Sequence, residues 1–154
     1  MHRTYENREI TVFWDSDKCF HAKKCVTGCP EVFEFARRPW IDLSRGSNPE
    51  IWQTVEKCPS GALTVAYNHG VEIGFDEDGH RSTAFLDGEM IGECDYLEDE
   101  NGWTIVHTEV DSEHEGKSIA KRLVFRVAEE AERRKKNIIP VCSYAQKVLS
   151  PSDR

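Results

Sequence analysis

Six cysteines narrow the choice of folds for this 154-residue chain; they lie at positions 19, 25, 29, 58, 94 and 142. Four of the six fall within the first 58 residues, and Cys29 and Cys58 are each followed by proline. An even number of cysteines is typical of disulfide-bonded secreted domains. The polar stretch at residues 1–9 is unlike a secretory signal, so we expect a cytoplasmic protein whose clustered thiols bind metal or react.

Composition and charge exclude two classes of partner. Hydrophobic residues make up 38% of the chain and charged residues 31%. No apolar run approaches the roughly 18 residues that a membrane-spanning helix needs. The formal net charge of −8 disfavours binding to nucleic-acid phosphates. We therefore expect neither a membrane nor a nucleic acid among the partners.

Turn-forming residues at 68–70 divide the chain into two predicted domains, residues 1–69 and 70–154. In the first, the pattern predicts strands at 10–15 and 62–67, a turn-and-helix stretch at 19–29, an extended segment at 38–43 and a helix at about 48–57. In the second, it predicts strands at 81–86, 89–96, 103–110 and 138–141, a long helix at about 117–136 and a short helix at 144–149. The fold class is therefore α+β. A half-length domain has a marginal hydrophobic core, which a metal often supports.

The first four cysteines have the spacing Cys-x5-Cys-x3-Cys-Pro, followed by a distant Cys-Pro. Iron–sulfur clusters take soft thiolate ligands, and bacterial ferredoxins supply them from a C-x2-C-x2-C-x3-C-P run. Cys19 matches the first position of that run and Cys25 the third, with Ala22 at the second. Cys58 matches the remote ligand before proline. A zinc site is the alternative, but C-x5-C-x3-C with a distant fourth cysteine is not the pattern of C-x2-4-C pairs seen in zinc ribbons.

Residues 5–67 resemble the ferredoxins and, more closely, a divergent family of single-cluster iron–sulfur domains. Five blocks carry the resemblance: CFHA at 19–22, CV at 25–26, PEVF at 30–33, RPWI at 38–41 and CPSGAL at 58–63. The resemblance implies that Cys19, Cys25 and Cys58 bind one 4Fe-4S or 3Fe-4S cluster. The family commonly has an apolar residue at the position of Cys29. We prefer Cys29 as the fourth ligand, with His21 as the alternative, and three ligands alone would suit a three-iron cluster.

The segment VDSEHEGKSIAKRL at 110–123 joins a predicted strand to the long helix. Its small residues Gly116, Ser118 and Ala120 allow backbone N–H groups to approach an anion at the helix N-terminus, as happens when a pyrophosphate is bound. A plain helix start is equally consistent with this segment alone.

Residues 71–150 resemble the minimal branch of the GNAT acetyltransferase superfamily. The resemblance rests on Gly88, Gly92 and Tyr96, on HTEV at 107–110, on GKSIAK and Leu123 at 116–123, and on IPVCSY at 139–144. It implies transfer of an acetyl group from acetyl-CoA to an unknown amine. The implied cofactor-binding residues are Val110, Glu115, Gly116, Lys117, Ser118, Ile119, Ala120 and Tyr144. This branch usually has Arg-Gly-x-Gly where the chain has EGKS at 115–118, so Glu115 adds a negative charge and Ser118 a β-carbon close to the pyrophosphate.

Two residues are candidates for catalysis. Cys142 follows a predicted strand, near where the thioester lies in this superfamily, and it could accept the acetyl group or line the pocket. His107 could act as the base, although a hydrogen-bonded strand histidine is equally consistent. We expect Cys94 in the core and His114 in solvent.

The sequence thus predicts an iron–sulfur protein with a minimal GNAT-like domain. Its function would be acetyl-CoA-dependent N-acetyl transfer, or acetyl-CoA binding, coupled to redox or iron state. The alternatives are a single-cluster electron carrier that needs a redox partner protein, and a non-enzymatic redox or iron sensor.

Overall fold

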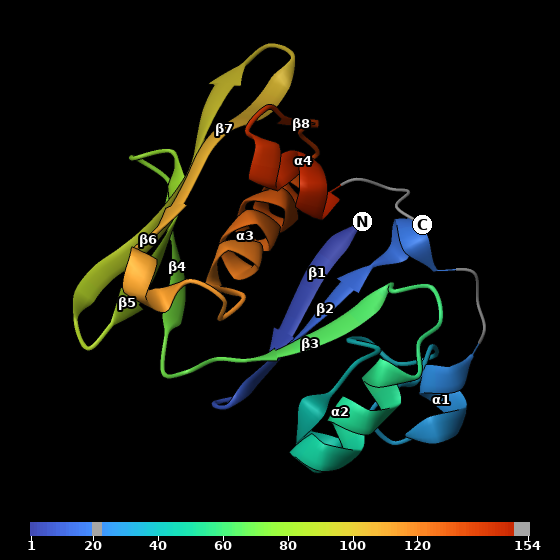
Figure 1. Cartoon of the computed structure of the whole chain (residues 1–154). Helices are drawn as coiled ribbons and strands as arrows, with labels where there is room; N and C mark the ends of the chain where they lie inside the picture. Colours follow the sequence, from blue (N-terminus) through green and yellow to red (C-terminus); the bar gives the residue numbers. More distant parts are fainter. Residues whose placement is uncertain (20–22, 150–154) are drawn as a thin grey trace. The chain divides into compact units, whose positions relative to one another are not determined.

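The computed structural model describes residues 1–19 and 23–149. Its contacts divide the chain into two compact units between Tyr67 and Asn68, each with its own sheet (Figure 1). Within the described residues, no helix combines the length and the apolar character needed to cross a membrane.

The N-terminal unit is a three-stranded sheet with short helices. The strands pair in the order β1 (His2–Glu6), β2 (Ile10–Asp15) and β3 (Leu63–Tyr67). The helical elements are η1 (Ser16–Lys18), α1 (Lys24–Gly28), η2 (Leu43–Arg45) and α2 (Asn48–Glu56). The polar strand β1 was not predicted. The predicted extended segment at 38–43 forms only one isolated bridge, between Ile41 and Phe33.

Helix α2 is fixed at its start by a capping box. The Ser47 side chain accepts a hydrogen bond from the backbone N–H of Glu50, whose side chain accepts one from the N–H of Ser47. Ile51 and Val55 are buried on the inner face of the helix, in the core of this unit. The next turn leads directly to Cys58, so the cap and the buried face together fix where this cysteine lies.

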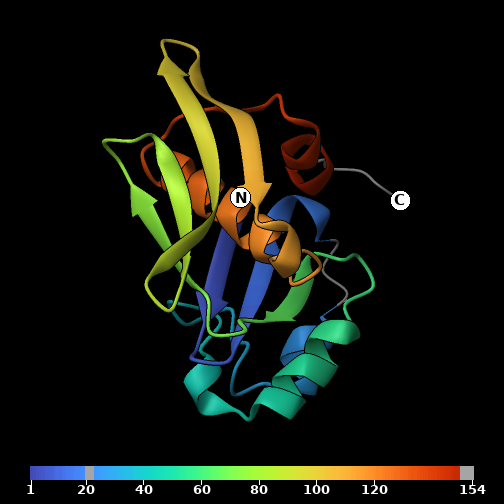
Figure 2. The same ribbon diagram turned by 60° about the vertical axis from the view of Figure 1, so that its left-hand side comes forward.

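The C-terminal unit is a five-stranded sheet with α3 packed on one face (Figure 2). The strands pair in the order β4 (Glu72–Asp76), β5 (Arg81–Leu86), β6 (Glu89–Asp99), β7 (Gly102–Val110) and β8 (Ile138–Pro140). All neighbours are antiparallel except β7 and β8, which are parallel. The helices are η3 (Ser112–His114), α3 (Ile119–Arg133) and α4 (Ser143–Leu149). The predicted α+β class and this order of elements are confirmed, and β4 was missed.

Helix α3 holds this unit together through one apolar face. Its buried residues at helical spacing are Ile119, Leu123, Val124, Val127, Ala128 and Ala131. Burying each of the larger aliphatic side chains contributes about 1.5–3 kcal/mol. On the sheet, Tyr96 and Trp103 stack with ring centroids 4.1 Å apart. Because side chains alternate along a strand, Thr108 and Val110 share one face of β7, and His107 and Glu109 lie on the other.

Candidate metal centre and candidate active site

Three cysteines of the N-terminal unit come together from separate elements. Cys19 follows η1, Cys25 lies in the first turn of α1, and Cys58 comes one residue after Lys57, which ends α2. All three are half-buried against the core of this unit. Burial raises the pKa of Cys25, and the negative charges of nearby Cys58 and Cys19 raise it further. Such a group of thiols is a donor set for a soft metal centre.

The loop after α2 prepares Cys58 to act as a thiolate. Burial alone would raise the pKa of Cys58, but hydrogen bonds from the Ser60 hydroxyl and from the backbone N–H groups of Leu63, Ser60 and Ala62 bring it below the ordinary value. The Ser60 Oγ lies 3.4 Å from the Cys58 Sγ and also accepts from the N–H of Ala62 at 3.1 Å. Hydrogen bonds to ligand sulfurs are among the features that tune iron–sulfur clusters, so this loop fits such a ligand.

Cys29 lies one helical turn after Cys25, and its backbone N–H donates to the Cys25 carbonyl at 3.1 Å. It is only 8% exposed, and its Sγ would be 3.6 Å from a β-carbon added at Gly46, which precedes α2. Burial raises its pKa, as do the charges of Glu50 and Glu31. Cys29 is thus beside the start of α2, whereas Cys58 follows its end. We therefore expect the other three cysteines to be the cluster ligands, and the role of Cys29 stays a prediction.

The other predicted fourth ligand, His21, falls outside the described residues. In the part of the chain that is described, no three cysteine sulfurs lie within 4.8 Å of one another. A tetrahedral zinc ion with bonds of 2.3 Å needs its sulfurs about 3.8 Å apart. A cluster spaces its thiolates more widely, because each binds a different iron atom. The described thiols therefore do not form the tight set that one zinc ion needs.

A cavity of about 470 Å³ lies at the N-terminus of α3 in the C-terminal unit. Its lining residues are Thr108, Val110, His114, Glu115, Gly116, Ser118, Ile119, Ala120 and Tyr144. Seven of the eight predicted cofactor-binding residues are in this set. Ser118 precedes α3 in a left-handed conformation, with φ of 60°, and makes no capping hydrogen bond. The N-terminal end of a 15-residue helix therefore faces a cavity, an arrangement suited to an anion.

His114 does not lie in solvent, where it was predicted to be. The His114 side chain is 16% exposed and lines the cavity. Lys117, the remaining predicted cofactor-binding residue, places its Nζ 3.3 Å from His114 Nδ1. An ammonium group can only donate, so Nδ1 must accept and the proton of a neutral ring lies on Nε2. Nε2 is thus the donor of the neutral His114 ring, and it lies 4.0 Å from Glu113 Oε1.

Cys142 lies beside the cavity wall. Its Sγ is 3.4 Å from the Oγ1 of Thr108 and accepts from the backbone N–H of Ala145 at 3.3 Å. Thr108 lines the cavity, and so does Tyr144, which lies two positions after Cys142 in the sequence. The structure therefore brings Cys142 together with the predicted cofactor-binding residues.

His107, the other predicted catalytic residue, lies on the opposite face of β7. Its side chain is 54% exposed, and its Nε2 lies 3.0 Å from Glu109 Oε1. That hydrogen bond raises the pKa of His107. His107 is not among the residues that line the cavity. The structure therefore does not bring it to Cys142.

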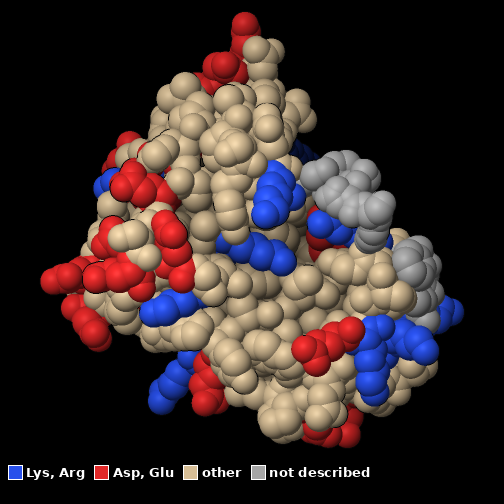
Figure 3. Space-filling model, viewed as in Figure 1, with Lys and Arg blue, Asp and Glu red and all other residues tan. Residues whose placement is uncertain are grey.

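A second cavity, of about 490 Å³, adjoins the first through Val110 and Glu115. Its other lining residues are Glu109, Asp111, Ser112 and Glu113, so four carboxylates surround it. Figure 3 shows acidic side chains gathered over η3 and the strands beside it. This part of the surface favours positively charged molecules.

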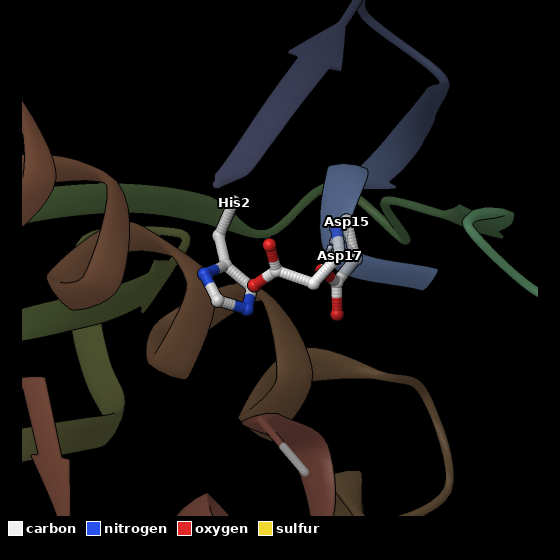
Figure 4. Close-up of side chains that lie close together, drawn as sticks. All are labelled: His2, Asp15 and Asp17. Carbon is white, nitrogen blue, oxygen red and sulfur yellow. Dashed lines mark hydrogen bonds between the residues drawn. The ribbon is translucent and has the colours of Figure 1, made fainter. Parts of the chain in front are cut away.

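A different group of oxygen and nitrogen donors lies near the N-terminus (Figure 4). One atom each of His2, Asp15 and Asp17 falls within a 4.8 Å set. The carboxylates already have partners: Asp15 accepts from the N–H of Asp17 at 3.1 Å, and Asp17 lies 3.4 Å from the N-terminal ammonium of Met1. We assign no metal to this group.

Two family models match separate parts of the chain, one in each compact unit. A model of the "divergent 4Fe-4S mono-cluster" family matches residues 5–68. The uncharacterized protein YjdI of Escherichia coli K12 is 32% identical over 68 residues, which cover 44% of this chain and 87% of YjdI. The O157:H7 strain has a relative of the same identity and coverage. The chain belongs to this iron–sulfur family.

The C-terminal unit matches a second family. A model described as "GCN5-related N-acetyl-transferase" matches residues 81–153. Two solved structures are similar at 17% identity. A ribosomal-protein-alanine N-acetyltransferase from Brucella melitensis biovar Abortus 2308 has a TM-score of 0.35, with 85% of this chain and 77% of that chain covered. A GCN5-related N-acetyltransferase from Sphaerobacter thermophilus has a TM-score of 0.37, with 89% and 39% covered. The assignment of the unit rests on the family model and not on these two structures.

Proposed function

We propose that the C-terminal unit transfers acetyl groups from acetyl-CoA to a cationic amine, and that the N-terminal unit binds an iron–sulfur cluster through Cys19, Cys25 and Cys58. The observation that carries the transferase proposal is the cavity at the start of α3, with Cys142 beside its wall. It combines an anion-binding helix end with a nucleophile in one place.

The diphosphate of coenzyme A would bind at the α3 end of this cavity. The first backbone N–H groups of α3 have no partner within the helix and can donate to phosphate oxygens. His114 Nε2 and the ammonium of Lys117 add a donor and a positive charge. Glu115 opposes them as the one carboxylate among the lining residues. We expect moderate affinity as a result.

Cys142 is the proposed nucleophile. Its thiolate attacks the thioester carbonyl carbon, the carbon–sulfur bond to coenzyme A breaks, and the coenzyme leaves as a thiolate that takes up a proton. The acceptor amine then attacks the acetyl group on Cys142, loses a proton and restores the thiolate. The N–H of Ala145 stabilises the negative sulfur at both ends of this sequence.

The acidic cavity beside the first one supports a positively charged acceptor. Glu109, Asp111, Glu113 and Glu115 would attract an ammonium group and hold it near the cofactor cavity. An amine must lose its proton before it attacks, and carboxylates close to it can accept that proton.

Calorimetry with coenzyme A tests the transferase proposal on full-length protein purified without oxygen. We expect saturable binding by the wild type. Lys117→Ala should weaken that binding about tenfold, as expected for loss of a charged group near phosphate. Lys147→Ala, in α4, is the matched control and should bind like the wild type. Failure of the wild type to bind coenzyme A would reject the transferase proposal.

Iron and sulfide analysis tests the cluster proposal. Serine substitutions at Cys19, Cys25 and Cys58 should each abolish cluster content, because each removes a thiolate ligand. Cys29→Ser is the matched control and should keep the cluster, since Cys29 lies beside the other end of α2. Loss of the cluster from Cys29→Ser would show that Cys29 is a ligand after all.

A further inference from the structure

We propose that Thr108 is the positioning residue of Cys142: its hydroxyl bridges the thiols of Cys94 and Cys142 and donates to Cys142 when that sulfur carries negative charge. The inference rests on the proposed role of Cys142 as a nucleophile. It concerns how this thiol is oriented and stabilised.

The geometry places one hydroxyl between two sulfurs. Thr108 Oγ1 is 3.5 Å from Cys94 Sγ and 3.4 Å from Cys142 Sγ. Cys94 lies directly opposite Thr108 on β6, and Cys142 follows β8 on the other side of β7. The three side chains therefore cross the sheet in a row, and the middle one, Thr108, also lines the cofactor cavity.

The hydrogen bonds among Cys94, Thr108 and Cys142 can be arranged in two ways, depending on which groups carry a proton. A threonine hydroxyl has a single proton to donate, so it cannot donate to both sulfurs at once. When Cys142 is a thiol, Thr108 donates to Cys94 and accepts from Cys142. When Cys142 is a thiolate, Thr108 must donate to it, and the hydroxyl oxygen then accepts from the S–H of Cys94. Each polar group keeps a partner in both arrangements.

Of the two cysteines, Cys94 is the one that stays protonated. It is completely buried. Burial raises its pKa to about 12, and the charges of Cys142 and Asp95 oppose its ionisation as well. Tyr144, two residues after Cys142 on α4, is also titratable, and burial raises its pKa. Negative charge in this row therefore belongs on Cys142, where Ala145 N–H and Thr108 O–H both donate to it.

The test is the alkylation rate of Cys142 by iodoacetamide in the full-length, cluster-loaded protein at neutral pH. Trypsin releases residues 137–147 as one peptide with Cys142 as its sole cysteine, so mass spectrometry follows this thiol alone. Thr108→Val keeps the shape and removes the hydroxyl. We expect about tenfold slower alkylation, since a hydrogen bond to a charged group is lost. Thr108→Ser should restore the wild-type rate.

Thr104→Val is the matched control, because it makes the same change on the same strand, opposite Leu97. It should alkylate like the wild type. If Thr108→Val does not fold, Thr108→Ala makes the same comparison. Equal rates in Thr108→Val and the wild type, or a Thr108→Ser variant as slow as Thr108→Val, would overturn the inference. The alkylation needs no cofactor, so it decides on Thr108 separately from the coenzyme A calorimetry that tests the proposed function.

Discussion

Replacing Ser118 by glycine should stabilise the C-terminal unit. Ser118 has φ of 60° and ψ of 18°, a left-handed conformation that costs a residue with a β-carbon about 1–2 kcal/mol. Glycine avoids this cost but loses about 0.5–1 kcal/mol through its greater freedom in the unfolded chain. The Ser118 side chain makes no capping hydrogen bond that the change would remove. The net gain in the free energy of unfolding is about 0.5–1 kcal/mol.

Native-state hydrogen exchange measures this gain within one unit. The slowest amides of α3 exchange through opening of the C-terminal unit, and they report its stability without a contribution from the N-terminal unit. A gain of this size slows their exchange about two- to fivefold, because 1.4 kcal/mol is a factor of ten. Ser118→Ala is the control, since it removes the hydroxyl and keeps the β-carbon. It should exchange no more slowly than the wild type.

A result in which Ser118→Gly exchanges as fast as the wild type would refute the strain argument. Slowing by both variants would mean that the hydroxyl, and not the backbone conformation, is responsible. The same glycine variant should bind coenzyme A more tightly, since the backbone at the start of α3 can then approach the diphosphate more closely.

Three further predictions concern other parts of the molecule. Burial, together with the hydrogen bond and charge of Glu93, raises the pKa of Asp95 from 3.8 to about 6, so the folded state holds this proton more tightly than the unfolded state. Stability against urea should therefore fall as pH rises through this range, and Asp95→Asn should remove that part of the fall. Gly92→Ala should destabilise the C-terminal unit by about 1–3 kcal/mol in urea unfolding, because its β-carbon would lie 2.9 Å from the carbonyl oxygen of Glu109. A stability equal to the wild type would contradict this packing. Ser60→Ala should speed release of iron to a chelator, since it removes the hydroxyl that donates to Cys58 and accepts from the Ala62 N–H; unchanged release would argue against a role for this loop.

The sequence predicted those helices and strands whose characteristic residues are close neighbours along the chain. The apolar period from Ile119 to Ala131 gave α3, and Asp87-Gly88, with positive φ at both residues, gave the turn between β5 and β6. Strands β1 and β4 lack a comparable signal. Strand β1 is largely polar, and β4 has Gly74 at its centre, so their pairing depends on neighbouring strands supplied by distant parts of the chain.

The candidate sites show a similar limit. Spacing indicated Cys19, Cys25 and Cys58, but it carries no information about side-chain direction, and Cys29 proves to lie in the core. For His107 the information was present in the sequence. Because side chains alternate along a strand, His107 and its neighbour Thr108 lie on opposite faces of β7. The position of His107 in the sequence is therefore enough to separate it from the cavity that Thr108 lines. His114 was overlooked because a turn residue was assumed to face solvent.

Cys19, Cys25 and Cys58 are three thiols, so one of them is left unpaired if the other two are oxidised to a disulfide in air. If the cluster is lost, dioxygen can take two electrons and two protons from one pair of these cysteines and form a disulfide, which leaves the third without a mate. We expect Cys29 to stay reduced, because its side chain is buried beside the start of α2. The leftover thiol is then exposed to a thiol of another chain. Oxygen damage would therefore appear on a non-reducing gel as covalently linked dimers, and a bound cluster would protect the protein against crosslinking.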